Sequence, residues 1–183
     1  MSDVFPVSYR IRDLRQSGWK SIPDEPGVYW WFFPEPCLDE LQITSHCEFT
    51  LLNLLTNEND MVALYVGAAK SLRQRTKWHA DQPLTQSNLQ SKYLSTFRNT
   101  LLSLTQIDYA TGFKLINQFM DSLEVAWQVT SDKESAERIE AKELDGFSLP
   151  LNINTNPRPE LTLYKRFLKQ QRESYRETHL KKD

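Results

Sequence analysis

The sequence places one carboxylate on the apolar face of an expected helix, where it destabilises the fold unless it is paired or bound to a metal. Glu140 lies one turn from both Ala136 and Leu144, on the apolar stripe of a helix expected over residues 132–144. A carboxylate that points into an apolar face is unfavourable unless it pairs with a cation or binds a metal. Three interpretations therefore stand for this position: a metal ligand, the partner of an arginine, or a side chain that bends outward to water.

A second helix repeats this pattern with basic side chains. Leu72, Arg75 and His79 recur at helical spacing in a segment that Ser71 can begin as an N-cap. Arg75 and His79 are thus expected on the side of the helix that faces the core. They form either a solvated basic face or, with Glu140, parts of one site. Two helices that both turn ionisable groups inward favour a single site.

The basic residues are concentrated in two parts of a chain whose formal net charge is −2. Residues 68–98 hold six basic residues against one acidic residue, and residues 157–183 hold eight against four. The stretches 1–67 and 99–156 are correspondingly acidic. A near-neutral protein with this asymmetry can present a phosphate-facing surface, although a solvated charged helix produces the same counts.

The elements that must position these residues follow from periodicity. Apolar and aromatic runs predict strands at 27–33, 62–67 and 123–129. Helical spacing follows at 71–79, 94–104 and 132–144, and a long basic helix begins near residue 159. Strands and helices do not alternate regularly, so the pattern predicts a small α+β layer fold.

The length of 183 residues predicts one domain with appendages. We expect a lead-in at 1–26, a main domain at 27–156 with an insertion at about 35–60, and a basic C-terminal helix at 157–183. Cys37 and Cys47 lack metal-ligand spacing and are expected as reduced thiols. The chain shows no secretion signal and no apolar run of about 18 residues, so we expect a cytoplasmic protein without a membrane span.

Two short motifs in the expected strands resemble those of a known family. Gly27-Val28-Tyr29 and Tyr65-Val66-Gly67 are similar to the paired motifs of the GIY-YIG nucleases, with valine in place of isoleucine in both. Arg75 stands eight residues after the second glycine, where the family has its catalytic arginine. A histidine four residues later, His79, is similar to a pattern of the family's restriction-endonuclease-like branch.

The later part of the chain resembles the same family. Residues 134–140 match its E-x-A-x-x-x-E helix pattern, and Pro150 and Asn152 match the proline and asparagine that close its domain. The four ordered motifs span residues 27–152. The resemblance implies the α+β GIY-YIG nuclease fold, a small three-stranded, mostly antiparallel sheet flanked by helices, here with an extra C-terminal helix.

The chain departs from the family pattern at two places. The family often has lysine directly after the second glycine, where this chain has Ala68, with Lys70 as the only nearby replacement in sequence. The insertion at 35–60 separates the first two motifs, which a hairpin tip tolerates, and it can add a contact to the target. Ala68 keeps an alternative function open, that of a catalytically impaired DNA-binding protein with the GIY-YIG fold.

The resemblance implies a metal-dependent endonuclease that hydrolyses DNA phosphodiester bonds. Glu140 would be the single protein ligand of Mg²⁺, with Mn²⁺ as a substitute, since a lone carboxylate suits an ion that keeps several waters. Arg75 would stabilise charge on the scissile phosphate, because its planar guanidinium is always charged.

The resemblance also implies groups that handle water and protons. Tyr29 or Tyr65 would position or deprotonate the attacking water, provided that Arg75 lowers the phenol pKa from its ordinary value near 10. His79 would share in proton transfer. Asn152 would orient a group at the metal site.

DNA is the partner that the resemblance implies, with no membrane, no small-molecule cofactor, and a monomer or homodimer as the oligomeric state. The C-terminal helix either docks its apolar stripe on the domain and turns its basic residues toward the duplex flanks, or is a solvated terminal helix without a role in DNA binding. Restriction, repair and mobile-element contexts stay open, as does preference for DNA over RNA. Motifs of unrelated small-molecule enzymes are not found. The residues expected to contact the DNA backbone are Lys70, Arg73, Lys77, Lys92 and Arg98.

Overall fold

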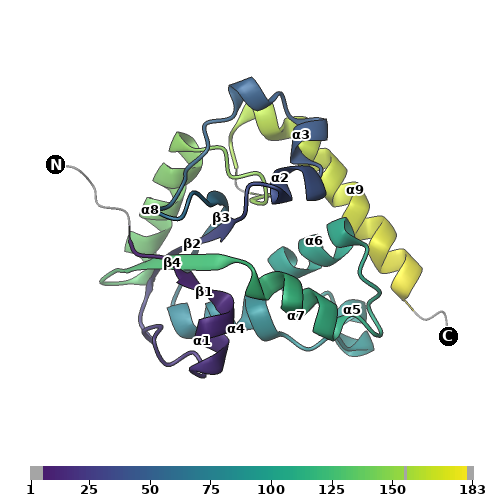
Figure 1. Cartoon of the computed structure of the whole chain (residues 1–183), viewed down its shortest axis with the longest axis horizontal. Helices are drawn as coiled ribbons and strands as arrows, with labels where there is room; N and C mark the ends of the chain where they lie inside the picture. Colours follow the sequence, from purple (N-terminus) through teal and green to yellow (C-terminus); the bar gives the residue numbers. More distant parts are fainter. Residues whose placement is uncertain (1–5, 155, 181–183) are drawn as a thin grey trace.

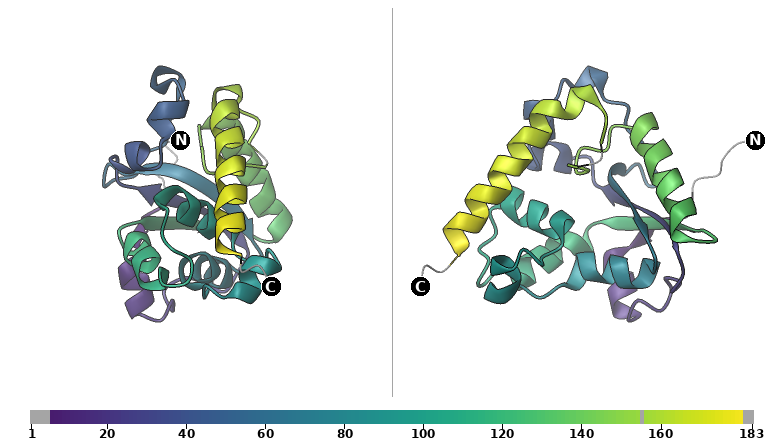
Figure 2. Two further views of the ribbon diagram at one scale, coloured as in Figure 1. Left: turned by 90° about the vertical axis from the view of Figure 1, so that its right-hand side faces the viewer. Right: turned by 180° about the vertical axis from the view of Figure 1, so that it is seen from behind.

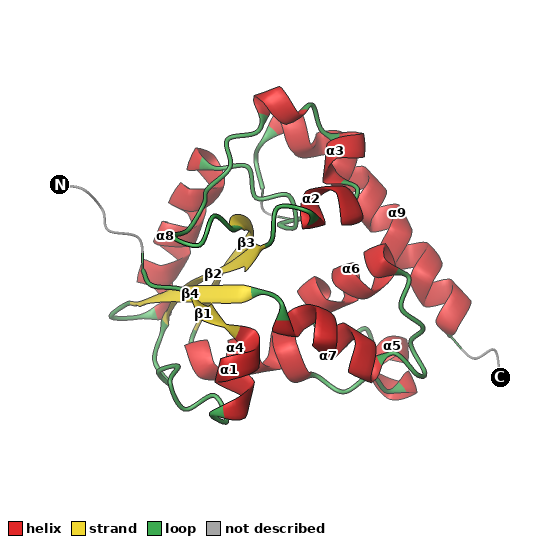
Figure 3. Ribbon diagram, in the orientation of Figure 1, coloured by secondary structure: helices red, strands yellow, loops and turns green. Residues whose placement is uncertain are grey.

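The structure is a computed structural model that describes residues 6–154 and 156–180. One sheet lies at its centre, with helices on both faces and a long helix along one side (Figures 1 and 3). The strands are β1 (Tyr9–Arg10), β2 (Gly27–Phe33), β3 (Val62–Ala69) and β4 (Glu124–Val129). The α-helices are α1 (Ile11–Gln16), α2 (Cys37–Glu40), α3 (Ile43–His46), α4 (Leu72–Asp81), α5 (Gln86–Gln90), α6 (Thr96–Thr105), α7 (Phe113–Asp121), α8 (Lys133–Gly146) and α9 (Thr162–His179). Two short 3-10 helices are η1 (Phe49–Leu51) and η2 (Pro159–Leu161).

The sheet has the strand order β1-β4-β2-β3, and each neighbouring pair is antiparallel. The α+β class and the antiparallel sheet predicted from the sequence are confirmed. The described residues form four strands rather than three, because Tyr9 and Arg10 add a short strand to the outer side of β4. Two residues are too few for apolar alternation to reveal a strand in sequence. β3 lies at the opposite edge.

The central strand β2 is buried along its whole length because helices cover both faces of the sheet. The even-numbered residues from Val28 to Phe32 pack on the α8 side, together with Leu144. The odd-numbered residues from Tyr29 to Phe33 belong to the larger core that includes residues of α1, α4, α6 and α7. Strand alternation therefore places the Tyr29 side chain on the α4 side of the sheet.

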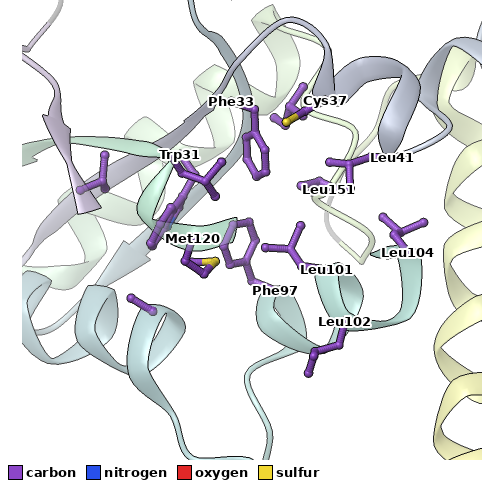
Figure 4. Close-up of a cluster of buried hydrophobic side chains, with 14 of the residues drawn as sticks. Trp31, Phe33, Cys37, Leu41, Phe97, Leu101, Leu102, Leu104, Met120 and Leu151 are labelled. Atoms are coloured by element: carbon purple, nitrogen blue, oxygen red, sulfur yellow. The ribbon is translucent and has the colours of Figure 1, made fainter. Parts of the chain in front are cut away.

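Aromatic and aliphatic side chains pack α6 against β2 (Figure 4). The rings of Trp31 and Phe97 lie 5.0 Å apart between centroids, and Phe33 meets the edge of Phe97 at 6.2 Å. Leu101 and Met120 complete the same cluster. This packing holds the start of α6, which Ser95 caps, close to the end of α4, which carries His79.

Among the described helices that follow the insertion, α5 and α7 are not predicted from the sequence. α7 buries Ile116 and Met120, four residues apart, so its apolar spacing could have identified it. α5 is only five residues long and lies in a segment expected to be a polar loop. α8 begins one residue later than the expected start at 132, because Asp132 caps it by accepting the Ser135 N–H at 2.7 Å.

The insertion after β2 rests on α9. Tyr164 donates a hydrogen bond to the Leu41 carbonyl at 2.7 Å, and the rings of His46 and Phe167 stack with centroids 3.9 Å apart. Leu168 is fully buried in the main core, so α9 contributes to that core. None of the helices in the described ranges is long and apolar enough to cross a membrane.

Candidate active site

The site is built around β3, and the segment after α8 completes the outer side of this edge strand. An edge strand presents unpaired backbone groups at every second residue. The Leu64 carbonyl accepts a hydrogen bond from the Leu151 N–H at 2.9 Å. The Asn152 side chain bonds both backbone groups of Val66, accepting from its N–H at 3.0 Å and donating to its carbonyl at 2.8 Å. Asn152 is buried with its carboxamide engaged on the strand, so it positions β3.

Glu140 interacts with Ala68, two residues further along β3 than Val66. Its carboxylate accepts a hydrogen bond from the Ala68 N–H, while its side chain is half-buried. Burial raises the pKa of Glu140, the neighbouring Glu137 raises it further, and Lys133 and Arg75 lower it. No salt bridge to Glu140 is formed within the described ranges. The interpretation of Glu140 as the partner of an arginine therefore loses support, and a carboxylate with free acceptor capacity is left beside β3.

Each of the two motifs has its glycine at a position where another group of the protein lies close to the backbone. Tyr29 lies directly opposite Gly67 in the β2–β3 ladder, and its phenol lies against the Gly67 backbone. A Cβ atom at Gly67 would come within 2.4 Å of the Tyr29 hydroxyl oxygen. A Cβ at Gly27 would come within 2.4 Å of the Gln128 carbonyl oxygen and would also meet Leu72. Gly67 thus provides the space in which the Tyr29 hydroxyl is held.

A hydrogen-bonded chain runs inward from Tyr29. Its hydroxyl lies 2.8 Å from Nε2 of His79, and Nδ1 of His79 lies 2.5 Å from Oγ of Ser95. Ser95 is the N-cap of α6 and accepts the Arg98 N–H at 3.2 Å. Burial, and secondarily the Arg75 charge, lowers the pKa of His79 to about 3. His79 is therefore neutral at pH 7 and serves as a hydrogen-bonding group rather than a charge.

Tyr65 lies next to this chain and is half-buried. Its ring centroid is 6.3 Å from that of Tyr29 and 5.8 Å from that of His79. Burial, followed by the charge of Glu140, raises the pKa of Tyr65 to about 12, and burial raises the pKa of Tyr29 as well. Arg75 lowers both, but desolvation outweighs it. The expectation that Arg75 brings a phenol pKa below its ordinary value is thus wrong.

Arg75 lies at the rim of the site, not on the core side of α4 where its spacing predicted it. α4 buries Leu72, Thr76 and His79, whereas Arg75 is exposed. Its guanidinium lies over the Trp78 ring, 4.9 Å from the centroid, which holds the charge near the surface. Leu72 and Arg75 are three residues apart, so a small rotation of the helix is enough to separate them.

A groove of about 660 Å³ opens beside these residues. Lys70, Arg75 and Lys133 line it, together with the aromatic residues Trp78 and Tyr93. Arg75 and Lys133 also influence the pKa of Glu140, which places this carboxylate within electrostatic reach of the groove. The arrangement places three cations and one carboxylate near one another beside β3.

The four sequence motifs therefore converge in space, from β2, from β3 with α4, from α8 and from the segment after α8. A family model, that of the GIY-YIG catalytic domain, matches residues 27–174 and so covers most of the chain. The chain belongs to the GIY-YIG family. The predicted membership in this nuclease superfamily is confirmed, and the restriction-endonuclease-like branch stays a prediction. No curated protein and no solved structure shows significant similarity to the chain.

Two of the basic residues predicted to contact DNA have structural roles in this GIY-YIG domain. Arg98 is 0% exposed, so its prediction as a surface contact is wrong. It donates to the Ala80 carbonyl and to the Asn117 side chain, both at 2.6 Å. Position 98 is one turn from both Leu94 and Leu101, and that spacing could have placed it on the buried face. Arg73 is half-buried and donates to the Ile22 carbonyl at 2.8 Å.

Two functional candidates of the GIY-YIG domain are missed by the sequence analysis. Ser95 contacts His79 from a different helix, and the spacing of 16 residues carries no recognisable pattern. Lys133 lies in the first turn of α8, two turns before Glu140, and that helical spacing could have indicated its position. Lys70 and Lys77 are exposed, as expected for phosphate contacts. Lys92 is exposed too, but it lines a different cavity.

Burial of neutral His79 should make the GIY-YIG domain less stable in acid. The unfolded chain binds a proton near the ordinary pKa of 6.5, whereas the folded chain binds it only near 3. The contribution of neutral His79 to the free energy of unfolding is present in full above about pH 6.5. As the pH falls toward 3, this contribution decreases by up to about 1.4 kcal/mol per pH unit. His79→Gln cannot titrate and should show a shallower decline of unfolding free energy, measured by urea denaturation between about pH 4 and pH 6.5.

The titratable and charged groups that face His79 are Tyr29, Tyr65 and Arg75, and they are the same in both proteins. Glu140, whose raised pKa acts in the opposite direction, is also common to both. The difference in slope therefore isolates His79. Equal slopes would show that His79 is not held neutral by the fold.

Proposed function

We propose that this protein is a metal-dependent endonuclease that hydrolyses phosphodiester bonds in DNA. The observation that carries the proposal is that Arg75 lines the groove from α4 while Glu140, on α8 at the opposite face of the sheet, lies within its electrostatic reach. An acceptor-rich carboxylate within electrostatic reach of a guanidinium suits a phosphate-bound cation and the phosphate itself. Membership of the GIY-YIG family supports the nuclease chemistry.

The donor set near the groove fits Mg²⁺. The described residues contain no group of three or more histidine, cysteine, aspartate or glutamate side chains that could enclose a metal. Glu140 would therefore hold the ion alone, which suits Mg²⁺ because this ion keeps several waters and uses substrate phosphate oxygens. Mn²⁺ should substitute. When bound, the ion would neutralise charge on the phosphate and stabilise the leaving oxygen.

The remaining roles belong to the chain's own residues. Arg75 would bind a non-bridging oxygen of the scissile phosphate through its planar fork. Tyr65, half-buried between Glu140 and Tyr29, would position the attacking water by a hydrogen bond. Tyr29 would orient Tyr65 in turn, since their hydroxyls interact and His79 holds Tyr29 from behind. We assign His79 to positioning, because a group with a pKa of about 3 is a poor proton store.

The absence of the family's lysine at Ala68 does not leave the groove without cations. The Ala68 N–H already serves Glu140, and its side chain is small and half-buried. Lys70 lies two residues further, and Lys133 approaches from α8. Both line the groove and would attract the phosphate backbone. The arrangement thus favours an active enzyme over an impaired DNA-binding protein.

The proposal is tested by incubating the full chain with supercoiled plasmid DNA in Mg²⁺, in Mn²⁺ and in excess EDTA. We expect nicked or linear DNA with either metal and intact plasmid with EDTA. A labelled RNA of the same sequence as a DNA fragment serves as the competing substrate. DNA that is bound but not cut would establish the impaired binding protein, and faster cleavage of RNA would overturn the substrate assignment.

A further inference from the structure

A second basic cavity lies between α9 and the α5–α6 segment. α9 and α8 occupy opposite sides of the molecule, so this cavity is far from Glu140 (Figures 1 and 2). Its volume is about 310 Å³. The charged residues that line it are Lys92, Lys169, Arg172, Arg176 and Glu173. With four basic residues against one acidic residue, the cavity carries a net positive charge.

Arg172 is the unusual member of this group. Its side chain is half-buried, and the Nε and Nη1 atoms are out of contact with solvent. Neither atom has a hydrogen-bond partner among the described residues. Buried donors of a charged group cost free energy when they are left unsatisfied, and burial accordingly lowers the pKa of Arg172. The Oδ1 atom of Asn99, in the same cavity, is also unsatisfied within the described ranges.

The other arginine of the cavity, Arg176, already has hydrogen-bond partners. Arg176 donates from Nε to the Leu89 carbonyl at 3.1 Å and from Nη2 to the Gln90 carbonyl at 3.2 Å. These bonds hold α9 against α5 and so fix the width of the cavity. Arg176 therefore forms part of the cavity wall, whereas two donors of Arg172, Nε and Nη1, have no partner among the described residues.

A continuous surface connects this cavity with the catalytic groove. Trp78 and Tyr93 line the groove and also a shallow depression between α4 and α5. Asn88 lines that depression and the α9 cavity as well. Tyr93, between the two ends, is 67% exposed. A strand that leaves the groove can therefore follow this face, past an exposed aromatic ring, to Arg172.

We propose that the α9 cavity is a second phosphate-binding site, which holds a backbone phosphate of the nucleic-acid strand cut at the groove. This inference rests on the proposed nuclease function. Arg172 lines the cavity, and its guanidinium can turn its N–H donors toward phosphate oxygens that enter it. Lys92 and Lys169 add charge without fixed partners in the cavity. The site fixes the strand at a distance from the scissile bond and so selects how the substrate lies on the enzyme.

The test uses Arg172→Met, which keeps an unbranched apolar stem but removes the donors. Arg166→Met is the matched control, because Arg166 is exposed on the same helix and does not line the cavity. Thermal unfolding of each full-length protein is measured with increasing inorganic phosphate at constant ionic strength. Affinity for a DNA duplex is measured in EDTA, without cleavage, over a series of salt concentrations.

We expect phosphate to raise the unfolding temperature of the unmodified protein and of Arg166→Met, but not of Arg172→Met. DNA affinity of Arg172→Met should fall several-fold, and its salt dependence should flatten by about one unit of slope. A phosphate effect unchanged in Arg172→Met would overturn the site. A lost phosphate effect with unchanged DNA affinity would show a site for free phosphate and overturn the nucleic-acid assignment. Neither measurement depends on cleavage, so failure of the nuclease function is recognised separately.

Discussion

Glu140→Gln should lower metal-dependent DNA cleavage at least about a hundredfold, the loss typical of removing a key electrostatic group from an active site. Glutamine keeps an oxygen that can accept the Ala68 N–H, so the packing of α8 on β3 should survive. It lacks the negative charge that a divalent cation requires. Initial rates of plasmid nicking at several Mg²⁺ concentrations measure the effect.

The stability of Glu140→Gln separates a catalytic role from a structural one. Burial raises the pKa of Glu140, which means that the fold disfavours its charge, so a neutral side chain should not lower the unfolding temperature. Glu137→Gln, one turn earlier and half exposed, is the matched control and should retain its rate. Full activity of Glu140→Gln, or equal losses in both variants, would remove Glu140 from the metal site.

Arg75→Ala should lower the cleavage rate by about a hundredfold or more with little change in DNA affinity, because its charge is used in the transition state. Its guanidinium is held over Trp78 at the groove. Arg75→Lys keeps the charge but loses the planar fork, so we expect it to recover only part of the rate. Single-turnover cleavage and equilibrium binding in EDTA measure the two quantities separately.

Lys77 is the matched control for Arg75. It is exposed on the same helix, and Lys77→Ala should weaken DNA binding modestly, flatten its salt dependence by about one unit of slope and leave the rate at saturation unchanged. Arg73 is unsuitable as a control because its bond to the Ile22 carbonyl helps to hold α4. Similar rate losses in Arg75→Ala and Lys77→Ala would show that Arg75 acts only through general attraction.

Local sequence patterns were enough to predict the main strands of this protein and the helices that carry the site residues. Apolar and aromatic runs predict β2 and β3 as strands, and the apolar positions around His79 and Glu140 predict the helices that carry them. These patterns are visible in sequence because neighbouring residues in a strand or helix have fixed relative directions. The Ser71 cap of α4 is likewise visible, and the structure has it, with the Gln74 N–H as its donor at 3.1 Å.

Only the tertiary structure decided which side chains near the site are exposed. Arg98 is buried because α6 turns it toward the end of α4, where it donates to the carbonyls of His79 and Ala80. Arg75 is exposed because α4 turns Leu72, Thr76 and His79 toward the core instead. Asn152 bonds to the edge of β3, a strand 86 positions earlier in the chain, and Ser95 reaches His79 from another helix. These contacts join segments with no periodic relation in sequence. Their partners are set by how helices pack on a sheet, which single-segment patterns do not encode.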